Sequence, residues 1–286
     1  NFDALIGLLN DFENEMMFCS DDKHPDSLAE GHINLLCQRA VKKGIDIFKI
    51  LKAACLNPIS HYRMHVGQLR PGDAADFIIC QDLINFRVKA TFINGIRVSK
   101  DGKSLIDPPR PEIINHFDCG MKHPKDFRIR SQSGEVRVIH AIDGQLITES
   151  SAEKLETTHG MVQTDPEKDI LKIVVVNRYM AESKPAVAFI KNFGLKKGAI
   201  ASSVAHDSHN IIAVGIDDES ICTAVNMIIE KKGGISFADS KNSSLDKVLA
   251  LPVAGLMSNE NGYDIAEAYT NIDHTAKMAG SSLSSP

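Results

Sequence analysis

The short apolar run Met16-Met17-Phe18-Cys19 is the feature that most constrains the fold, because it lies between two segments of helical periodicity. Apolar residues at helical spacing predict a helix over residues 3–12, before the run. The run ends in Ser20-Asp21-Asp22, and a second helical pattern begins with the capping-box spacing of Ser27 and Glu30. A wholly apolar strand between helices is typical of parallel α/β structure, in which strands are buried on both faces.

The first 57 residues therefore fit the C-terminal end of a β/α barrel of the TIM type. The helix that begins near Ser27 is expected to stop near Gly44. A further helix is predicted from Asp46 to about Leu56, before Asn57-Pro58. Residues 1–57 are accordingly assigned to the barrel.

The pattern changes from residue 58 to residue 110, where turn residues and short strands replace the helices. Residues 67–76 are rich in turn-forming residues and lead into an apolar strand, Phe77–Cys80. Asn94-Gly95 then separates two further strand-like segments and is a strong hairpin signal, because both residues tolerate positive φ. The segment is predicted to be a small antiparallel β unit, part of a β-sandwich.

Residues 111–286 are predicted to form an α+β domain. Its first twenty residues or so, 111–130, are irregular and read as a connection between domains. Two helices are expected, over Asp218–Lys232 and Gly262–Met278, and the chain is expected to stop within this domain at Pro286, as part of a longer protein. The predicted strands span residues 135–139, 170–176, 199–205, 211–214, 235–238 and 248–251.

Composition limits the class of protein. The 286-residue chain is 43% hydrophobic, enough for a buried core, and its net charge of −5 leaves no broad basic face for nucleic acid. The six cysteines have no CxxC spacing and are read as reduced thiols in the cytoplasm. The sequence contains no run of about twenty apolar residues, so no membrane span is predicted. We therefore expect neither nucleic acid nor a membrane as partner.

Asp21, Asp22 and His24 form the first candidate site. They follow an apolar strand, and in a β/α barrel the C-terminal ends of the strands carry the active site. A carboxylate there can bind a divalent metal and take a proton from bound water, and an imidazole can carry that proton. The alternative is that one aspartate only begins the turn.

The second candidate site is the polar block His206-Asp207-Ser208-His209-Asn210, which lies between two predicted strands. Two imidazoles, a carboxylate, a hydroxyl and an amide are costly to bury without partners. The block therefore either faces a ligand or forms a solvated hairpin turn, and the spacing alone does not decide between these interpretations.

Both blocks resemble parts of the adenine deaminases of the amidohydrolase superfamily. The stretch from Phe18 to Pro25 followed by Gly31-His32-Ile33-Asn34 resembles the eighth-strand loop of that family's metal-dependent barrel, and residues 67–76 resemble the segment that returns from an amidohydrolase barrel to a β-sandwich. The segment Ala201–Ile211, with Gly233-Gly234-Ile235 and Leu251–Ser258, resembles the extra C-terminal domain of adenine deaminases.

The resemblance implies a function in purine salvage, the hydrolysis of adenine to hypoxanthine and ammonia. It implies a divalent metal, manganese or iron, with Asp21 as its final ligand and as the base; Asp22 is the alternative, and His24 assists. It also implies that His206, Asp207, His209 and Asn210 bind substrate or cap the active site. The expected partners are a small purine and further copies of the chain in a homo-oligomer.

The sequence departs from the family by containing no His-x-His pair and no upstream metal ligands. One carboxylate cannot hold a catalytic metal alone, so this chain by itself is expected to be inactive. Two alternatives stay open. One is another amidohydrolase acting on cyclic amides, and the other is a non-catalytic fragment that binds a small ligand.

Overall fold

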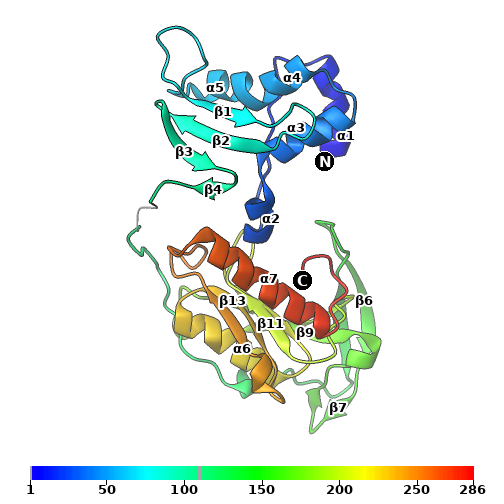
Figure 1. Ribbon diagram of the computed structural model, residues 1–286. Helices are drawn as coiled ribbons and strands as arrows, with labels where there is room; N and C mark the ends of the chain where they lie inside the picture. Colours follow the sequence, from blue (N-terminus) through cyan, green and yellow to red (C-terminus); the bar gives the residue numbers. More distant parts are fainter. Residues whose placement is uncertain (1, 108–110) are drawn as a thin grey trace. The chain divides into compact units, whose positions relative to one another are not determined.

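The computed structural model describes residues 2–107 and 111–286 and divides into two compact units, Asn1–Pro109 and Arg110–Pro286 (Figure 1). The first unit combines helices with a small antiparallel sheet, and the second packs helices on a larger sheet. Each unit has its own hydrophobic core, so each is described by itself.

Short helices make up the N-terminal part of the first unit. Their buried faces meet in one core that contains Leu9, Ile50 and Phe86. The periodicity of residues 3–12 is thus confirmed as helical, although its second half is a 3-10 helix. The helices are α1 (Phe2–Leu5), η1 (Ile6–Asn10), α2 (Pro25–Glu30), α3 (Ile33–Lys42), α4 (Ile47–Leu51), the π-helix η2 (Lys52–Leu56) and α5 (Asn57–Tyr62).

The predicted strand Met16–Cys19 is wrong. The segment is not part of any sheet, and its one backbone hydrogen bond to another element runs from Phe18 N–H to the carbonyl of Ala53, 3.2 Å away. A strand of a parallel sheet needs at least one neighbouring strand to pair with, and the first 76 residues supply none among those described. The described residues accordingly contain no closed barrel.

Two predicted helix boundaries in this region are wrong, at Ser27 and before Asn57-Pro58, whereas the stop near Gly44 and the start at Asp46 are confirmed. Ser27 lies inside α2, where its hydroxyl donates to the carbonyl of His24, because Pro25 starts the helix two residues earlier. Gly31 then breaks the chain into two helices, with φ of +156°. Pro58 does not end the following helix, since it occupies the first turn of α5 and needs no amide hydrogen there.

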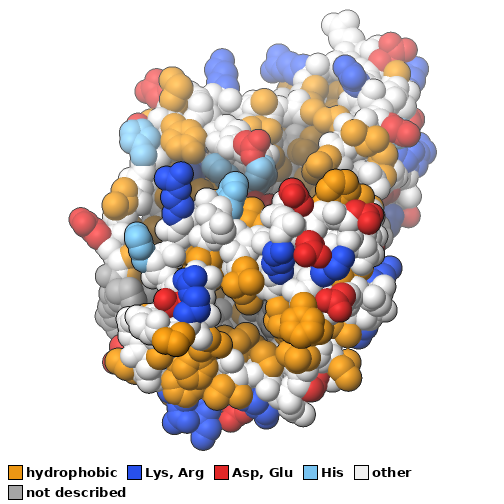
Figure 2. Space-filling model, turned by 90° about the horizontal axis from the view of Figure 1, so that it is seen from above, with side chains coloured by type: hydrophobic (Ala, Val, Ile, Leu, Met, Phe, Trp, Pro, Cys, Tyr) orange, Lys and Arg blue, Asp and Glu red, His pale blue; other side chains and the backbone are white. Residues whose placement is uncertain are grey.

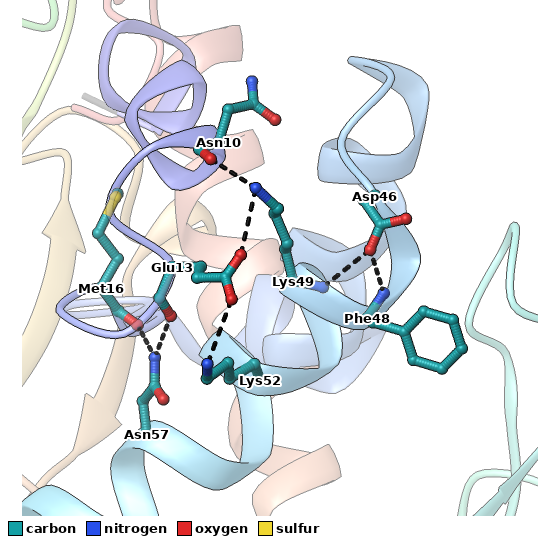
Figure 3. Close-up of polar contacts among 8 residues, drawn as sticks. All are labelled: Asn10, Glu13, Met16, Asp46, Phe48, Lys49, Lys52 and Asn57. Atoms are coloured by element: carbon teal, nitrogen blue, oxygen red, sulfur yellow. Dashed lines mark hydrogen bonds and ion pairs between the residues drawn. The ribbon is translucent and has the colours of Figure 1, made fainter.

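Side chains from α4, η2 and α5 hold the segment that leads to the Asp21 region (Figure 3). The Glu13 carboxylate forms ion pairs with Lys49 and Lys52, at 3.2 and 3.3 Å. The Asn57 amide donates to the carbonyls of Glu13 and Met16, both at 2.7 Å. The bond to Met16 satisfies a backbone carbonyl that a strand would have paired in a sheet ladder.

The small antiparallel sheet of the first unit confirms the predicted β unit. Its order is β1-β2-β3-β4, and the turn between β2 and β3 has positive φ at both Asn94 (+50°) and Gly95 (+75°), as a two-residue hairpin requires. The strands are β1 (Phe77–Cys80), β2 (Val88–Ile93), β3 (Ile96–Lys100) and β4 (Lys103–Ser104).

Asp76 ties this hairpin to the turn that precedes β1, and its carboxylate accepts from the amides of Gly67 and Asn94, both at 2.8 Å. These two bonds hold the pKa of the Asp76 carboxyl below its ordinary value. A lowered folded pKa adds stability above the unfolded pKa, and that stability is lost as the pH falls through the folded pKa.

Asp76→Ala should therefore lower the thermal midpoint of the first unit at neutral pH, with the deficit closing in acid below the ordinary aspartate pKa of about 3.9. Differential scanning calorimetry from pH 7 downward measures this, with Asp11→Ala as an exposed control. A deficit that does not change with pH would mean that the charge of Asp76 contributes nothing.

An open groove of about 760 Å³ lies in the first unit, beside α4, η2 and β1. Phe48 and Leu69 line it and are 76% and 73% exposed. Figure 2 shows such hydrophobic side chains in orange patches between charged ones on the face that it draws. Asp21, Asp22 and His24 are not among the lining residues, so the groove is not part of the candidate site.

The second unit contains an eight-stranded sheet of order β14-β13-β11-β12-β9-β10-β5-β6. All neighbouring strands are antiparallel except β10 and β5, which are parallel. The strands are β5 (Glu135–His140), β6 (Glu149–Lys154), β9 (Ile170–Val176), β10 (Ala186–Lys191), β11 (Ala199–Ser202), β12 (Ile211–Gly215), β13 (Gly234–Ala238) and β14 (Lys247–Ala250).

Helices α6 (Asp218–Lys231) and α7 (Gly262–Met278) cover opposite faces of this sheet (Figure 1). One core joins the apolar side of α6 to Val174 and Ala213, while the other joins α7 to Leu171 and Val214, which point to the opposite face of the same strands. Both helices were predicted within one residue of their observed bounds. The short β7 (Thr157–Thr158) and β8 (Met161–Val162) form a separate hairpin.

The described cysteines are free thiols. No helix in the described parts of the chain is long and apolar enough to cross a membrane.

Candidate functional site

The first candidate site is an exposed loop, residues 20–25, which we call the acidic loop. Asp21 has a left-handed backbone (φ +56°), and its carboxylate accepts from the amide of Asp22 at 3.0 Å. Asp22 and His24 are also exposed and follow directly in the same loop. The three predicted residues are therefore neighbours on the surface of the first unit, with the Asp21 carboxylate accessible to solvent.

Two contacts outside the predicted set shape the acidic loop. Ser20 Oγ is 2.6 Å from Nε2 of His32, and the Lys23 ammonium donates to the carbonyl of Gly31 at 2.8 Å. Both bonds join the acidic loop to the break between α2 and α3. The sequence signal for these contacts was the Gly31-His32 pair, which the resemblance included without a structural role.

The second candidate site is the loop from Ser203 to Asn210 between β11 and β12, which we call the histidine loop. Ser203 is fully buried at its start and bridges two other segments: its hydroxyl accepts from Gly234 N–H at 2.8 Å and donates to the carbonyl of Gly255 at 2.6 Å. The amide of His209 donates to the carbonyl of Ala205 at 2.6 Å and closes the turn.

The four predicted side chains of the histidine loop differ in exposure. Those of His206 and Asp207 are 69% and 86% exposed and contact each other through Nδ1 and Oδ1. His209 is half-buried, with its ring centroid 6.1 Å from that of His206. Nδ1 of His209 is buried and has no hydrogen-bond partner among the described residues. The loop thus holds two neighbouring imidazoles, that of His206 exposed to solvent and that of His209 with a buried Nδ1.

Arg178 supports the histidine loop and was missed in the sequence. It lies two residues after β9, is 3% exposed, and donates through Nε to the carbonyl of His209. Its own amide donates to Oδ1 of Asn210 at 3.4 Å. A charged residue directly after the apolar run 170–176 was the available signal, but its target could not be read from spacing.

Comparison with known proteins matches the two units to two family models. Residues 1–98 match the amidohydrolase family, and residues 145–286 match the adenine deaminase C-terminal domain. The adenine deaminase of Salinibacter ruber is 45% identical over all of this chain, that of Sulfurovum sp. is 47% identical over 99% of it, and that of Methanosarcina barkeri is 44% identical over all of it.

By these matches the chain is similar to the amidohydrolase family over its first 98 residues. Within it, the chain groups with the adenine deaminases, since the match extends through both units and includes the domain named for them. The chain spans about half the length of these relatives, 52% of the Salinibacter ruber protein and 51% of the Sulfurovum protein. The alternative of a cyclic-amide hydrolase receives no support from these matches.

Amidohydrolases generally depend on a metal, so the donor groups of this chain must be compared with such a centre. Across residues 2–107 and 111–286, no three His, Cys, Asp or Glu side chains are grouped so that they could hold a metal ion. Asp21 and Asp22 are exposed neighbouring carboxylates, whereas a catalytic centre of the zinc type is held by three protein ligands. The described residues do not fit a complete metal centre.

Proposed function

We propose that this chain is the C-terminal portion of an adenine deaminase, which converts adenine and water to hypoxanthine and ammonia. The observation that carries the proposal is the 45% identity across the entire chain, acidic loop and histidine loop included. The exposed carboxylate of Asp21 and the shielded imidazole of His209 supply the kinds of group that such a reaction needs.

The proposed arrangement assigns residues 1–57 to the end of the amidohydrolase barrel, residues 58–110 to the β-sandwich segment and residues 111–286 to the adenine-deaminase domain. The antiparallel sheet β1–β4 supports the second assignment, and the match over residues 145–286 supports the third. The first assignment rests on the family match over residues 1–98.

In the acidic loop, Asp21 is proposed as the base. Its carboxylate would take a proton from the attacking water and pass it to the departing amine as the C–N bond breaks. His24, three residues after Asp21 in the same loop, would assist as a second proton carrier. Asp21 would also supply one ligand to a divalent metal, manganese or iron, whose remaining ligands are not found among the described residues.

In the histidine loop, His206, Asp207, His209 and Asn210 are proposed to bind the purine. A purine ring presents several nitrogen acceptors and donors at its edge, and sites for such ligands place a few polar groups on a supported backbone. The unpartnered Nδ1 of His209 supports this role, because a buried polar atom without a partner is costly unless a ligand satisfies it.

His206→Ala should raise KM for adenine by roughly five- to ten-fold with little change in kcat, since one hydrogen bond contributes about 1 kcal/mol to binding. Steady-state kinetics of the whole protein measure this, with His274→Ala, an exposed histidine on α7, as the control. An unchanged KM for His206→Ala would remove His206 from the binding site.

The substrate class is tested with a panel. The whole protein is incubated with adenine and, separately, with cyclic amides, and the products are separated by chromatography. Hypoxanthine from adenine with intact cyclic amides supports the proposal. Ring-opened cyclic amides with intact adenine would overturn it and retain only the amidohydrolase family.

A further inference from the structure

Arg178 is a buried cation whose partners are almost all carbonyl or hydroxyl oxygens. Besides the bond from Nε to His209, its Nη2 donates to the carbonyl of Ala254 at 2.8 Å and to the Tyr179 hydroxyl at 3.0 Å. Nη1 lies 3.5 Å from Oδ1 of Asn115. No carboxylate of the described residues forms an ion pair with it.

Burial of a guanidinium without a carboxylate is costly, so the surrounding oxygens must compensate for the lost hydration. Aromatic rings add to that compensation: the guanidinium carbon lies 4.5 Å from the ring centroid of Tyr179 and 5.6 Å from that of Phe117. A residue that served only to fill this space would be apolar. The hydrogen bonds therefore indicate that the N–H groups of the Arg178 guanidinium, arranged as a planar fork, are needed to hold the surrounding oxygens.

The planar fork of Arg178 joins two loops that are far apart in sequence. His209 ends the histidine loop, and Ala254 lies in the segment between β14 and α7. The space around the fork is closed, since a Cβ atom at Gly255 would lie 2.3 Å from Nη1 of Arg178. Asn115 anchors the same point from a third segment, because its amide donates to the carbonyls of Lys232 and Pro252, at 2.7 and 2.8 Å.

From this geometry we propose that Arg178 is a positioning residue for purine binding, which fixes the histidine loop by holding the carbonyl of His209 against the Ala254 segment. The inference rests on the proposed function of that loop. Arg178 is buried and acts through the backbone of the histidine loop, at the carbonyl of His209. The side chains of His206 and His209 would contact the purine.

A matched control separates positioning from simple loss of stability. Lys172 is a second buried cation on the same strand, 4% exposed, but it lies near the start of β9 and pairs with Asp218. Lys172→Met and Arg178→Met each remove one buried cation, and only the second removes a contact with the histidine loop. A substitution that merely destabilises lowers the active fraction and hence the apparent kcat, without raising KM.

The experiment measures adenine kinetics of the whole protein and amide hydrogen exchange of residues 203–210 in both variants. For Arg178→Met we expect KM to rise about ten-fold, with faster exchange in the histidine loop. For Lys172→Met we expect KM and loop exchange to stay at the wild-type values. Arg178→Lys, which keeps the charge but not the fork, should give an intermediate KM and provides a folded variant.

Equal KM values in Arg178→Met and the wild type would overturn the inference, as would an equal rise in Lys172→Met. If the wild-type protein does not deaminate adenine, the proposed function fails. The exchange data still test whether Arg178 fixes the histidine loop. Faster exchange of the histidine loop in Arg178→Met, but not in Lys172→Met, supports the positioning role of Arg178. Unchanged exchange in Arg178→Met refutes it.

Discussion

Replacing Asp21 by Asn in the whole protein should lower kcat for adenine by about 100- to 10,000-fold, the usual contribution of a general base. Asn keeps the shape of the side chain and can still accept the amide hydrogen of Asp22 at Oδ1, so the loop conformation should survive. What is lost is the ability to take a proton. The loss should therefore fall on kcat far more than on KM.

Asp22→Asn is the matched control, since it changes the neighbouring carboxylate of the same exposed loop. Ammonia release at saturating adenine measures both variants. A large loss for Asp22→Asn with near wild-type rates for Asp21→Asn would transfer the role of base to Asp22. Wild-type rates for both variants would show that the acidic loop carries no catalytic carboxylate.

The largest expected effect on stability comes from Lys172→Met in the second unit. The Lys172 ammonium pairs with the Asp218 carboxylate, and their side chains are 5% and 15% exposed. Removal of one partner leaves the other charge buried and costs about 3–5 kcal/mol of unfolding free energy. Replacement of both, as Lys172→Met with Asp218→Leu, should recover most of that loss, because no buried charge remains.

The pH dependence of the single variant provides a second readout. Burial raises the pKa of Asp218, and Lys172 opposes that rise, so the variant should have a higher Asp218 pKa than the wild type. A raised pKa of Asp218 in the folded state favours the protonated native state. The loss of unfolding free energy in Lys172→Met should therefore shrink as the pH falls through that pKa. Urea unfolding at several pH values measures this. A double variant no more stable than the single one would contradict the buried-charge explanation.

Local signals predicted the elements whose determinants lie within the element itself. Asn94-Gly95 specifies its hairpin by backbone preference, and α6 carries acidic residues at its start and Lys231 at its end. Strand β9 was recognised because six of its seven residues are apolar, as suits its place in the centre of the sheet. Such elements need no knowledge of distant partners.

Elements that depend on partners were mispredicted or missed. Residues 16–19 have the composition of a buried strand, but a strand exists only where neighbours supply hydrogen bonds. The reverse holds for β6, whose polar sequence Glu149–Lys154 lies at the edge of the sheet and is a strand because β5 pairs with it. Neither outcome is encoded in local periodicity.

The candidate site divides in the same way. The acidic loop and the histidine loop were singled out as candidates because their polar residues are adjacent in sequence. Arg178 and Asn115 were missed because their partners, apart from Tyr179 beside Arg178, lie from 31 to 137 residues away along the chain. Contacts of that range follow from the topology of the eight-stranded sheet, which brings the ends of β9, β11 and β14 to one region.

The most direct test of the proposed function is an assay of ammonia and hypoxanthine formed from adenine. It compares the whole protein, expressed from its natural start, with this 286-residue chain, both supplied with manganese. We expect equal amounts of the two products from the whole protein and none from the chain alone, which lacks a complete metal centre among its described residues. A whole protein that leaves adenine unchanged would contradict the assignment.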